Sequence, residues 1–206
     1  MGPDGPALGG SLTLALKFMA TLLLALVLGA GSALLLIRSG GLGGQIASGP
    51  WETDLTIGSK EADPYTRARV AVAGLLALNR DETIYFTAES DGDGDPLKVS
   101  CSYKIEGNDP PARWWSITLY GEDHYLVSNP LERYSYGSET VTRNEDGGFL
   151  ITVGPDEAEG NWIPTGDSHT GATFTLTLRL YNPDESAARN PSGITLPQIA
   201  KEACAS

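Results

Sequence analysis

The segment 113–120, which reads RWWSITLY, constrains the fold more than any other part of the chain. Aromatic and β-branched residues alternate in it with polar ones, a pattern typical of a central strand. Three further runs, 84–88, 99–105 and 174–180, alternate in the same way. In the last of them Phe174 and three leucines share one face, and threonines and Arg179 share the other. These runs predict a mainly β domain.

Turn residues separate the predicted strands. Clusters of Gly, Pro, Asn and Asp occur at 91–96, 108–111, 121–123, 129–130, 144–148 and 182–183. Short strands with frequent turns favour an antiparallel, jelly-roll-like β-sandwich over a fold in which strands and helices alternate.

One helix is expected over residues 64–78, packed on the sandwich. Asp63 suits the N-cap, Pro64 suits the first helical position, and apolar residues follow at spacings of three and four.

The run 18–37 contains no charged residue and is built mainly from Leu, Ala, Val and Gly. As a helix it reaches about 30 Å, the thickness of the hydrocarbon core of a bilayer. Small residues at 28–33 also fit a cleaved signal peptide, but the apolar run continues through 34–37, which favours an uncleaved signal anchor. We therefore predict a cytoplasmic N-terminus (1–17), a transmembrane anchor (18–37), a glycine-rich flexible linker (38–50) and an extracytoplasmic β-sandwich (51–206).

The charge balance argues against a nucleic-acid partner. Asp and Glu number 26, Lys and Arg number 14, and no basic cluster is interleaved with aromatic residues. Such a surface repels a phosphate backbone.

Several separated motifs resemble the bacterial family known as domain of unknown function 1214. They are Asp63-Pro64-Tyr65, 85–88, the Asp-Gly turn after it, Cys101-Ser102-Tyr103, RWWSITLY, Asn161-Trp162-Ile163-Pro164, 179–183 and a cysteine near the C-terminus. The resemblance covers roughly residues 64–204, and Ile163 replaces the family's usual leucine. It implies a jelly-roll sandwich, no established reaction, and a protein partner of the domain of unknown function 1254 family.

Cys101 and Cys204 suit one disulfide that would pin the C-terminal tail to a strand, and the family pattern supports this pairing. The alternative is two reduced thiols in a cytoplasm. A disulfide needs an oxidising compartment, so its formation would place the domain outside the cytoplasm, in the periplasm of a single-pass inner-membrane protein.

Motifs for metal binding and catalysis are incomplete. Asp91, Asp93 and Asp95 lack the glycine and glutamate that an EF-hand loop requires, and the two histidines, His124 and His169, do not fit a zinc spacing with the cysteines. The stretch 166–169 holds Asp, Ser and His side by side, whereas catalytic triads assemble from separate segments. We expect no metal, no cofactor and no catalytic residue.

Aromatic residues and arginines form the candidate binding group. Flat rings and planar guanidinium groups on one concave face would suit a sugar or another protein. Because Trp114 and Trp115 point to opposite faces of a strand, at least one should lie in the core, and filling of the sandwich is the alternative role for the whole group. The candidates are Arg113, Trp114, Trp115, Tyr134, Trp162, Arg179 and Tyr181.

Taken together, the sequence predicts a membrane-anchored, non-catalytic binding or assembly module of the cell envelope. A carbohydrate-binding or carbohydrate-processing domain is the first alternative, and a hydrolase is the second.

Overall fold

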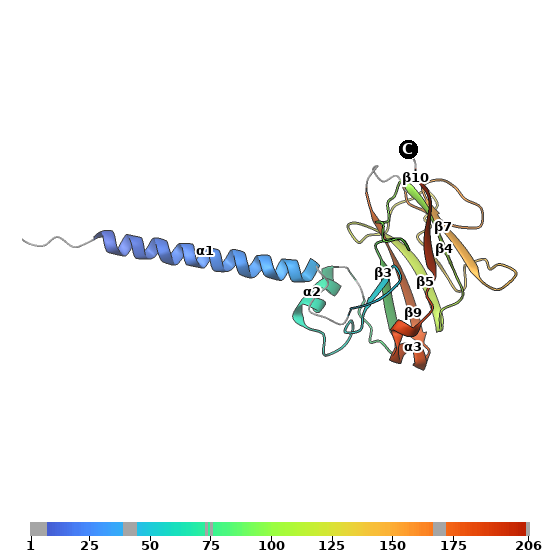
Figure 1. Ribbon diagram of the computed structural model, residues 1–206, viewed down its shortest axis with the longest axis horizontal. Helices are drawn as coiled ribbons and strands as arrows, with labels where there is room; N and C mark the ends of the chain where they lie inside the picture. Colours follow the sequence, from blue (N-terminus) through green and yellow to red (C-terminus); the bar gives the residue numbers. More distant parts are fainter. Residues whose placement is uncertain (1–7, 39–44, 73, 75, 167–171, 205–206) are drawn as a thin grey trace, which may run out of the picture.

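The computed structural model describes residues 8–38, 45–72, 74, 76–166 and 172–204. A long N-terminal helix leads into a β-sandwich with few other helices, which confirms the predicted fold class (Figure 1). The elements are α1 (Leu8–Arg38), β1 (Gln45–Ser48), β2 (Trp51–Asp54), α2 (Pro64–Val72), β3 (Thr83–Ala88), β4 (Cys101–Gly107), β5 (Ala112–Gly121), β6 (Ser135–Gly137), β7 (Phe149–Gly154), β8 (Asn161–Pro164), β9 (Phe174–Pro183), α3 (Glu185–Arg189), the 3₁₀ turn η1 (Pro191–Gly193) and β10 (Gln198–Cys204).

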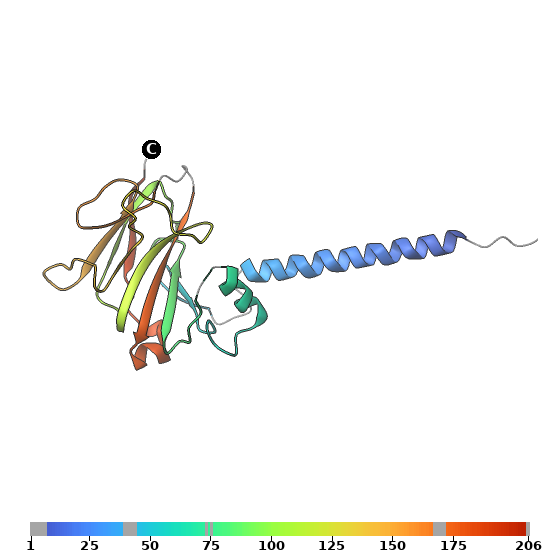
Figure 2. The ribbon, with the colours of Figure 1, turned by 180° about the vertical axis from the view of Figure 1, so that it is seen from behind.

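Within the described ranges the strands form two sheets. The large sheet has the order β1-β2-β3-β9-β5-β6, and the small sheet has the order β10-β4-β7-β8. The large sheet is the layer beside α1 and α2, and the small sheet lies on the far side (Figures 1 and 2). Neighbouring strands are antiparallel apart from β7 and β8, which run parallel because the chain turns back over residues 155–160. That pair departs from the fully antiparallel expectation.

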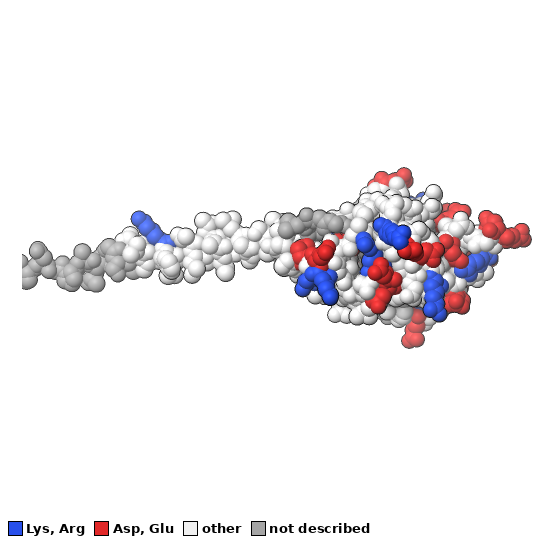
Figure 3. Space-filling view, turned by 90° about the horizontal axis from the view of Figure 1, so that it is seen from below, with Lys and Arg blue, Asp and Glu red and all other residues white. Residues whose placement is uncertain are grey.

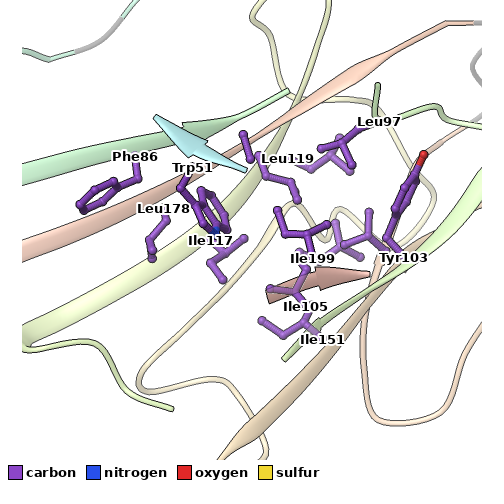
Figure 4. Close-up of a cluster of buried hydrophobic side chains, with 14 of the residues drawn as sticks. Trp51, Phe86, Leu97, Tyr103, Ile105, Ile117, Leu119, Ile151, Leu178 and Ile199 are labelled. Atoms are coloured by element: carbon purple, nitrogen blue, oxygen red, sulfur yellow. The ribbon is translucent and has the colours of Figure 1, made fainter. Parts of the chain in front are cut away.

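The alternating residues of β3, β9 and β5 build the core from one side. Leu178 of β9 pairs with Phe86 of β3 and with Ile117 of β5, so these three apolar side chains share the inner face. Each is at most 1% exposed. Figure 4 shows them opposite Ile105 and Ile151 of the small sheet.

Aromatic contacts join the two sheets. Trp115 of β5 stacks on Phe149 of β7 with ring centroids 4.6 Å apart. Tyr103 of β4 meets Phe174 of β9 edge to face at 5.6 Å. Such pairs stabilise a core beyond the apolar area that they bury.

Helix α2 starts as predicted and ends early. The backbone amides of Tyr65 and Thr66 donate to Asp63 Oδ1 at 2.8 and 3.2 Å, so Asp63 caps the helix. The helix stops at Val72 instead of residue 78, since Gly74 adopts a left-handed conformation with a φ of 63°. Of the side chains in α2 only that of Thr66 is buried, and Val72 is 66% exposed.

The ends of the folded domain are tied into the sheets. Strand β1 lies inside the stretch expected to be a linker, where residues 45–48 pair with β2. Residues 39–44, the glycine-rich part of that stretch, lie outside the described residues. At the other end β10 pairs with β4, and a disulfide joins Cys101 to Cys204 across this pair.

Helix α1 is long and apolar enough to cross a membrane by length and composition. The candidate span is Thr13–Ile37, 25 residues with a mean hydropathy of 2.4, and none of it is buried in the protein. The span contains one charged residue, Lys17. Figure 3 shows this mostly uncharged rod attached to a body on which acidic and basic side chains are interspersed.

Candidate functional site

The two adjacent tryptophans lie on opposite faces of β5, as the sequence predicts for neighbouring strand residues. Trp115 is 1% exposed, stacks on Phe149, and donates its indole N–H to Asp109 Oδ1 at 2.8 Å. Trp114 is 37% exposed and lies against Tyr181 of β9, with ring centroids 5.1 Å apart. Of the pair, Trp114 is the one available to a ligand.

Trp162 belongs to the framework of the sandwich. It is 8% exposed, and its indole N–H donates to the Gly154 carbonyl at 3.0 Å. Its backbone N–H donates to the Tyr136 hydroxyl at 3.2 Å, and its carbonyl accepts from Arg133 Nη1 at 3.3 Å. These bonds connect β8 of the small sheet to the segment around β6 of the large sheet, and they close one side of the sandwich.

The other predicted binding residues are spread over the outer face and its margins. Arg113 is exposed near the start of β5, and Tyr134 is half-buried just before β6. Arg179 and Tyr181 point outward from β9, the strand between β3 and β5. The structure therefore brings Trp114, Arg179 and Tyr181 onto one surface and leaves Trp115 and Trp162 inside.

The strand register arranges polar side chains in rows across the outer face of the large sheet. Arg179 pairs with Tyr85 of β3 and with Ser116 of β5. The next row holds the threonines 87, 177 and 118, and the row after that pairs Thr175 with Tyr120. Glu52 of β2 pairs with Thr87 and extends the threonine row. The rows therefore place hydroxyl groups, one carboxylate and one guanidinium group side by side on the strands.

A cleft of about 590 Å³ lies over these rows, and we call it the outer-face cleft. Its floor comes from β2, β3, β5 and β9, and its roof comes from α2 and the end of α1. The lining residues are Ile37, Gln45, Glu52, Thr53, Asp54, Ile57, Arg69, Val70, Val72, Gly74, Tyr85, Thr87, Glu89, Tyr120, His124, Thr175, Thr177 and Arg179.

A buried ion pair fixes the roof to the floor. Arg69 of α2 pairs with Asp54 of β2, whose side chain is 2% exposed. Asp54 Oδ1 also accepts from the backbone N–H and the hydroxyl of Thr56, at 2.8 and 2.6 Å. Because a buried carboxylate without partners is costly, these bonds hold α2 over the sheet.

A close backbone contact joins the loop after β2 to the segment that follows α2, and this contact also supports the roof. Gly58 has a φ of 73°, and a Cβ at this position would lie 1.9 Å from the Leu78 carbonyl oxygen. The Tyr85 hydroxyl donates to the Leu76 carbonyl in the same segment, and burial raises the pKa of Tyr85 above its ordinary value. Tyr85 therefore stays a neutral donor.

Arg179 is the cationic group of the floor. Its Nη2 donates to the Tyr120 hydroxyl at 2.8 Å, and its guanidinium carbon lies 5.3 Å from the centroid of the Tyr120 ring. The other N–H donors of this guanidinium form no hydrogen bond with a described residue, so they are available to a ligand. The arrangement is suited to binding an anionic or strongly accepting group.

The acidic turn at 91–95 is held by its own contacts. Asp91 Oδ1 accepts from the backbone N–H groups of Asp93 and Asp95, both at 3.0 Å. The Lys201 ammonium pairs with Asp95 and lies 3.8 Å from Asp91 Oδ2, and its hydrogen bond lowers the pKa of Asp95. No group of three or more potential metal ligands occurs in the part of the chain that the structure describes. The stretch 167–169, the core of the hydrolase alternative, lies outside the described residues.

A larger and more open hollow of about 870 Å³ lies at the opposite end of the sandwich, between the β4–β5 turn and α3. Its carboxylate Asp109 is already bonded to Trp115 and to Arg143. Because its walls are largely turns, we place the candidate site in the outer-face cleft, whose floor is sheet.

Sequence reasoning found part of this cleft and missed the rest. The alternation of β9 identified Thr175, Thr177 and Arg179 as one face, and the same reading of β3 would have added Tyr85 and Thr87. Asp54 and Arg69 were missed because nothing local to either residue indicates that they meet.

Comparisons with known proteins give a family and a fold. A family model described as "Protein of unknown function (DUF1214)" matches residues 82–185, half of the chain. No curated protein matches the chain. The crystal structure of the VPA0106 protein from Vibrio parahaemolyticus is similar over 69% of this chain, with 25% identity and a TM-score of 0.56. A putative uncharacterized protein from Burkholderia cenocepacia is 16% identical over 59% of the chain, with a TM-score of 0.39. The chain spans 36% and 29% of these two proteins.

The residues matched by the family model include only part of the outer-face cleft. Tyr85, Tyr120 and Arg179 of the floor lie inside it. Asp54, the roof helix α2 and the end of α1 lie outside it. The motif around Asp63 and the disulfide partner Cys204 also lie beyond the matched residues.

Proposed function

The chain belongs to the DUF1214 family of proteins of unknown function, and we propose that it is a membrane-anchored, non-catalytic binding module of the bacterial cell envelope. The domain stands on the periplasmic side of the inner membrane and takes its ligand in the outer-face cleft. The predicted span and the Cys101–Cys204 disulfide support the location, since disulfides persist in oxidising compartments.

The observation that carries the binding role is the position and lining of the outer-face cleft. Its floor presents hydroxyl groups, tyrosine rings and Arg179 from central strands, which gives fixed positions to groups that orient a ligand. Among the described residues, three carboxylates line the cleft. Asp54 is engaged by Arg69 and by Thr56, so it serves the structure of the roof. The other two, Glu52 of β2 and Glu89 just after β3, complete the polar lining. The anchor raises the concentration of the module near envelope partners, including a protein of the 1254 family that the sequence resemblance implies.

The test uses the full chain and two matched substitutions. Thr175→Trp places a large ring on the cleft floor, and Thr152→Trp makes the same change at a half-buried position of β7 in the other sheet. After extraction from native membranes in mild detergent, components that co-purify with each protein are identified by mass spectrometry. We expect the wild type and Thr152→Trp to retain a component that Thr175→Trp loses. Equal retention by both variants would contradict the proposed site.

The location is tested separately. A reporter that is active only outside the cytoplasm, fused after Ser206, is expected to be active in cells. An inactive reporter on a stable fusion would contradict the periplasmic placement.

Carbohydrate binding is the second candidate, and the exposed Trp114 and its contact with Tyr181 favour it. A tilted aromatic pair at the edge of a polar cleft suits the flat apolar face of a sugar ring. Saturable binding on a glycan array that Trp114→Ala removes would favour this function.

A further inference from the structure

We propose that the ligand of the outer-face cleft is an anionic phospholipid, whose phosphate binds Arg179 and whose acyl chains run along α2 toward the bilayer. This inference rests on the proposed function, because it needs the domain to stand at a membrane surface. It adds the chemical class of the ligand.

The first observation is the environment of Arg179. Among the described residues no carboxylate lies within 4.0 Å of its guanidinium, although Asp and Glu outnumber Lys and Arg by 26 to 14. Its cross-strand neighbours, Tyr85 and Ser116, are both neutral. Three arginines have acidic partners: Arg69 with Asp54, Arg143 with Asp109 and Arg189 with Glu185. Four other arginines whose side chains the structure describes, at positions 67, 80, 113 and 133, form no ion pair with a described residue, and Arg179 differs from them because it lines the floor of the cleft.

A half-buried guanidinium with unused donors is suited to a phosphate. The planar group offers several N–H donors, and paired donors match phosphate oxygens in a bidentate arrangement. Tyr120 holds the group in place from one side through its hydroxyl and its ring. The threonines 175 and 177 add hydroxyl groups on the same strand of the floor. The part of the floor around Arg179 therefore favours a compact anion, whereas Glu52 and Glu89 of the same lining would repel an anion placed beside them.

The second observation is the apolar part of the roof of the cleft. Ile37, the last residue of the candidate span, lines the cleft together with Val70 and Val72 of α2. Figures 1 and 2 show α2 directly beside the end of α1. Because α1 is the proposed membrane anchor, a cleft lined by the last residue of its span lies at the surface of the bilayer.

Helix α2 also exposes apolar residues next to this part of the roof. Val72 is 66% exposed, and Leu76, just beyond the helix, is 75% exposed. Apolar side chains in this position are favourable when they contact the interfacial region of a bilayer, which replaces water around them. A ligand that contacts both Arg179 on the floor and the apolar residues of the roof has an acidic head and an apolar tail, which is the chemistry of a phospholipid.

The test compares the affinity of the protein for a phospholipid with its affinity for the headgroup alone. The full chain in an uncharged detergent is titrated with dihexanoyl phosphatidic acid and, separately, with glycerol 3-phosphate, which has the same phosphate without acyl chains. We expect the lipid to bind at least about 100-fold more tightly than glycerol 3-phosphate, since burial of acyl methylene groups adds to the phosphate contact. Equal affinities would overturn the proposal and identify a site for a soluble anion.

Removal of the charge of Arg179 tests whether this residue contacts the phosphate of the lipid. Arg179→Gln is expected to weaken lipid binding by about tenfold or more, because it removes a charge-assisted hydrogen bond. Arg189→Gln removes the same charge from an exposed ion pair on α3 and is expected to leave the affinity unchanged. Circular dichroism checks that both variants fold. Wild-type affinity in a folded Arg179→Gln protein would overturn the proposal.

A second measurement needs no variant. Phosphatidic acid that carries a diazirine on an acyl chain is incorporated into vesicles with the wild-type chain, irradiated, and mapped by mass spectrometry. We expect adducts on α2 or on residues 174–183, and adducts confined to α1 would overturn the proposal. If the lipid fails in both measurements while Thr175→Trp still loses its co-purifying component, the cleft remains a binding site for another class of ligand.

Discussion

Trp114 and Trp115 are neighbours in the chain, but Trp114 lies on the surface and Trp115 lies in the core. Both are tryptophans on the same strand, yet one is 37% exposed and the other is 1% exposed. The cause is the period of two along a strand, which sends successive side chains to opposite faces. Composition alone therefore overestimates how many aromatic residues are available to a ligand.

Truncation of each tryptophan should give very different losses of stability. Trp115→Ala removes the stack on Phe149 and the bond to Asp109, and we expect it to lower the free energy of unfolding by about 3–5 kcal/mol. Trp114→Ala should cost about 1 kcal/mol or less, because its ring is already partly in water. Chemical denaturation in detergent, followed by circular dichroism, measures both. Equal losses would contradict the assignment of the two faces.

Some residues of the candidate site can be recognised from the local sequence pattern, and others cannot. Arg179 is a candidate because it lies near aromatic residues in the sequence, and the alternation from Phe174 onward places it on the face opposite the core. The Arg69–Asp54 pair was not, because its members lie 15 residues apart, on a helix and on a strand that meet only after folding. Trp162 was selected as an aromatic residue of a family motif, and its burial depends on contacts with β6 that no motif encodes.

At the scale of elements, α2 is where the sequence pattern and the structure differ most. The apolar spacing predicts a helix to residue 78 that packs on the sandwich, whereas α2 ends at Val72 and leaves that side chain exposed. A helical pattern shows that one face is apolar and does not show what covers it. Here the neighbour is the end of α1, a helix that is long and apolar enough to cross a membrane, so contact with a bilayer is a second explanation for the apolar face.

The cap of α2 should make stability depend on acid. The Thr66 hydroxyl bonded to Asp63, together with two backbone N–H groups, lowers the pKa of Asp63 below its ordinary 3.8. A lowered pKa means that the stabilisation is present above the unfolded pKa and is lost as the pH falls through the folded pKa. We expect the stability difference between wild type and Asp63→Asn to shrink as the pH falls from about 6 to below about 3.

Denaturation midpoints at several pH values measure this difference. Glu61→Gln, which removes an exposed carboxylate two residues away, is the control for loss of charge. A difference between wild type and Asp63→Asn that does not change with pH would contradict the role of the cap.

The disulfide should contribute strongly to the attachment of β10. It closes a loop with a sequence separation of 103 residues, for which loop-closure entropy gives about 4–5 kcal/mol. We expect a reductant to lower the denaturation midpoint of the wild type and to leave that of the Cys101→Ser, Cys204→Ser double variant unchanged. A wild-type midpoint that resists complete reduction would contradict this contribution.

At the scale of the whole molecule, the chain consists of a mostly uncharged rod and a charged body. The net charge of −12 belongs almost entirely to the body, where both signs are interspersed. Mixed charge keeps such a surface soluble, whereas the exposed span of α1 would not remain in water. Composition and hydropathy predicted this division, since it depends on residue type more than on tertiary contacts.

Removal of residues 1–38 should leave a folded, water-soluble domain. None of the span is buried in the protein, so its loss creates no cavity in the sandwich. We expect the shortened chain to stay in the aqueous phase during detergent phase separation and to keep a β-rich circular dichroism spectrum. The full chain, as the control, should enter the detergent phase. Aggregation or loss of the β spectrum would show that α1 is part of the fold.

The long separation between Cys101 and Cys204 has a consequence for the order of events during export. Under the proposed periplasmic location, the residues after α1 cross the membrane in chain order, so Cys101 emerges early and more than a hundred residues separate it from Cys204. Throughout that interval the thiol on β4 has no intramolecular partner, and the adjoining position in the small sheet is empty. In that compartment an oxidoreductase would meet a domain whose Cys101 is still reduced, and the pairing of β10 with β4 would both complete the small sheet and bring the second thiol into position for oxidation.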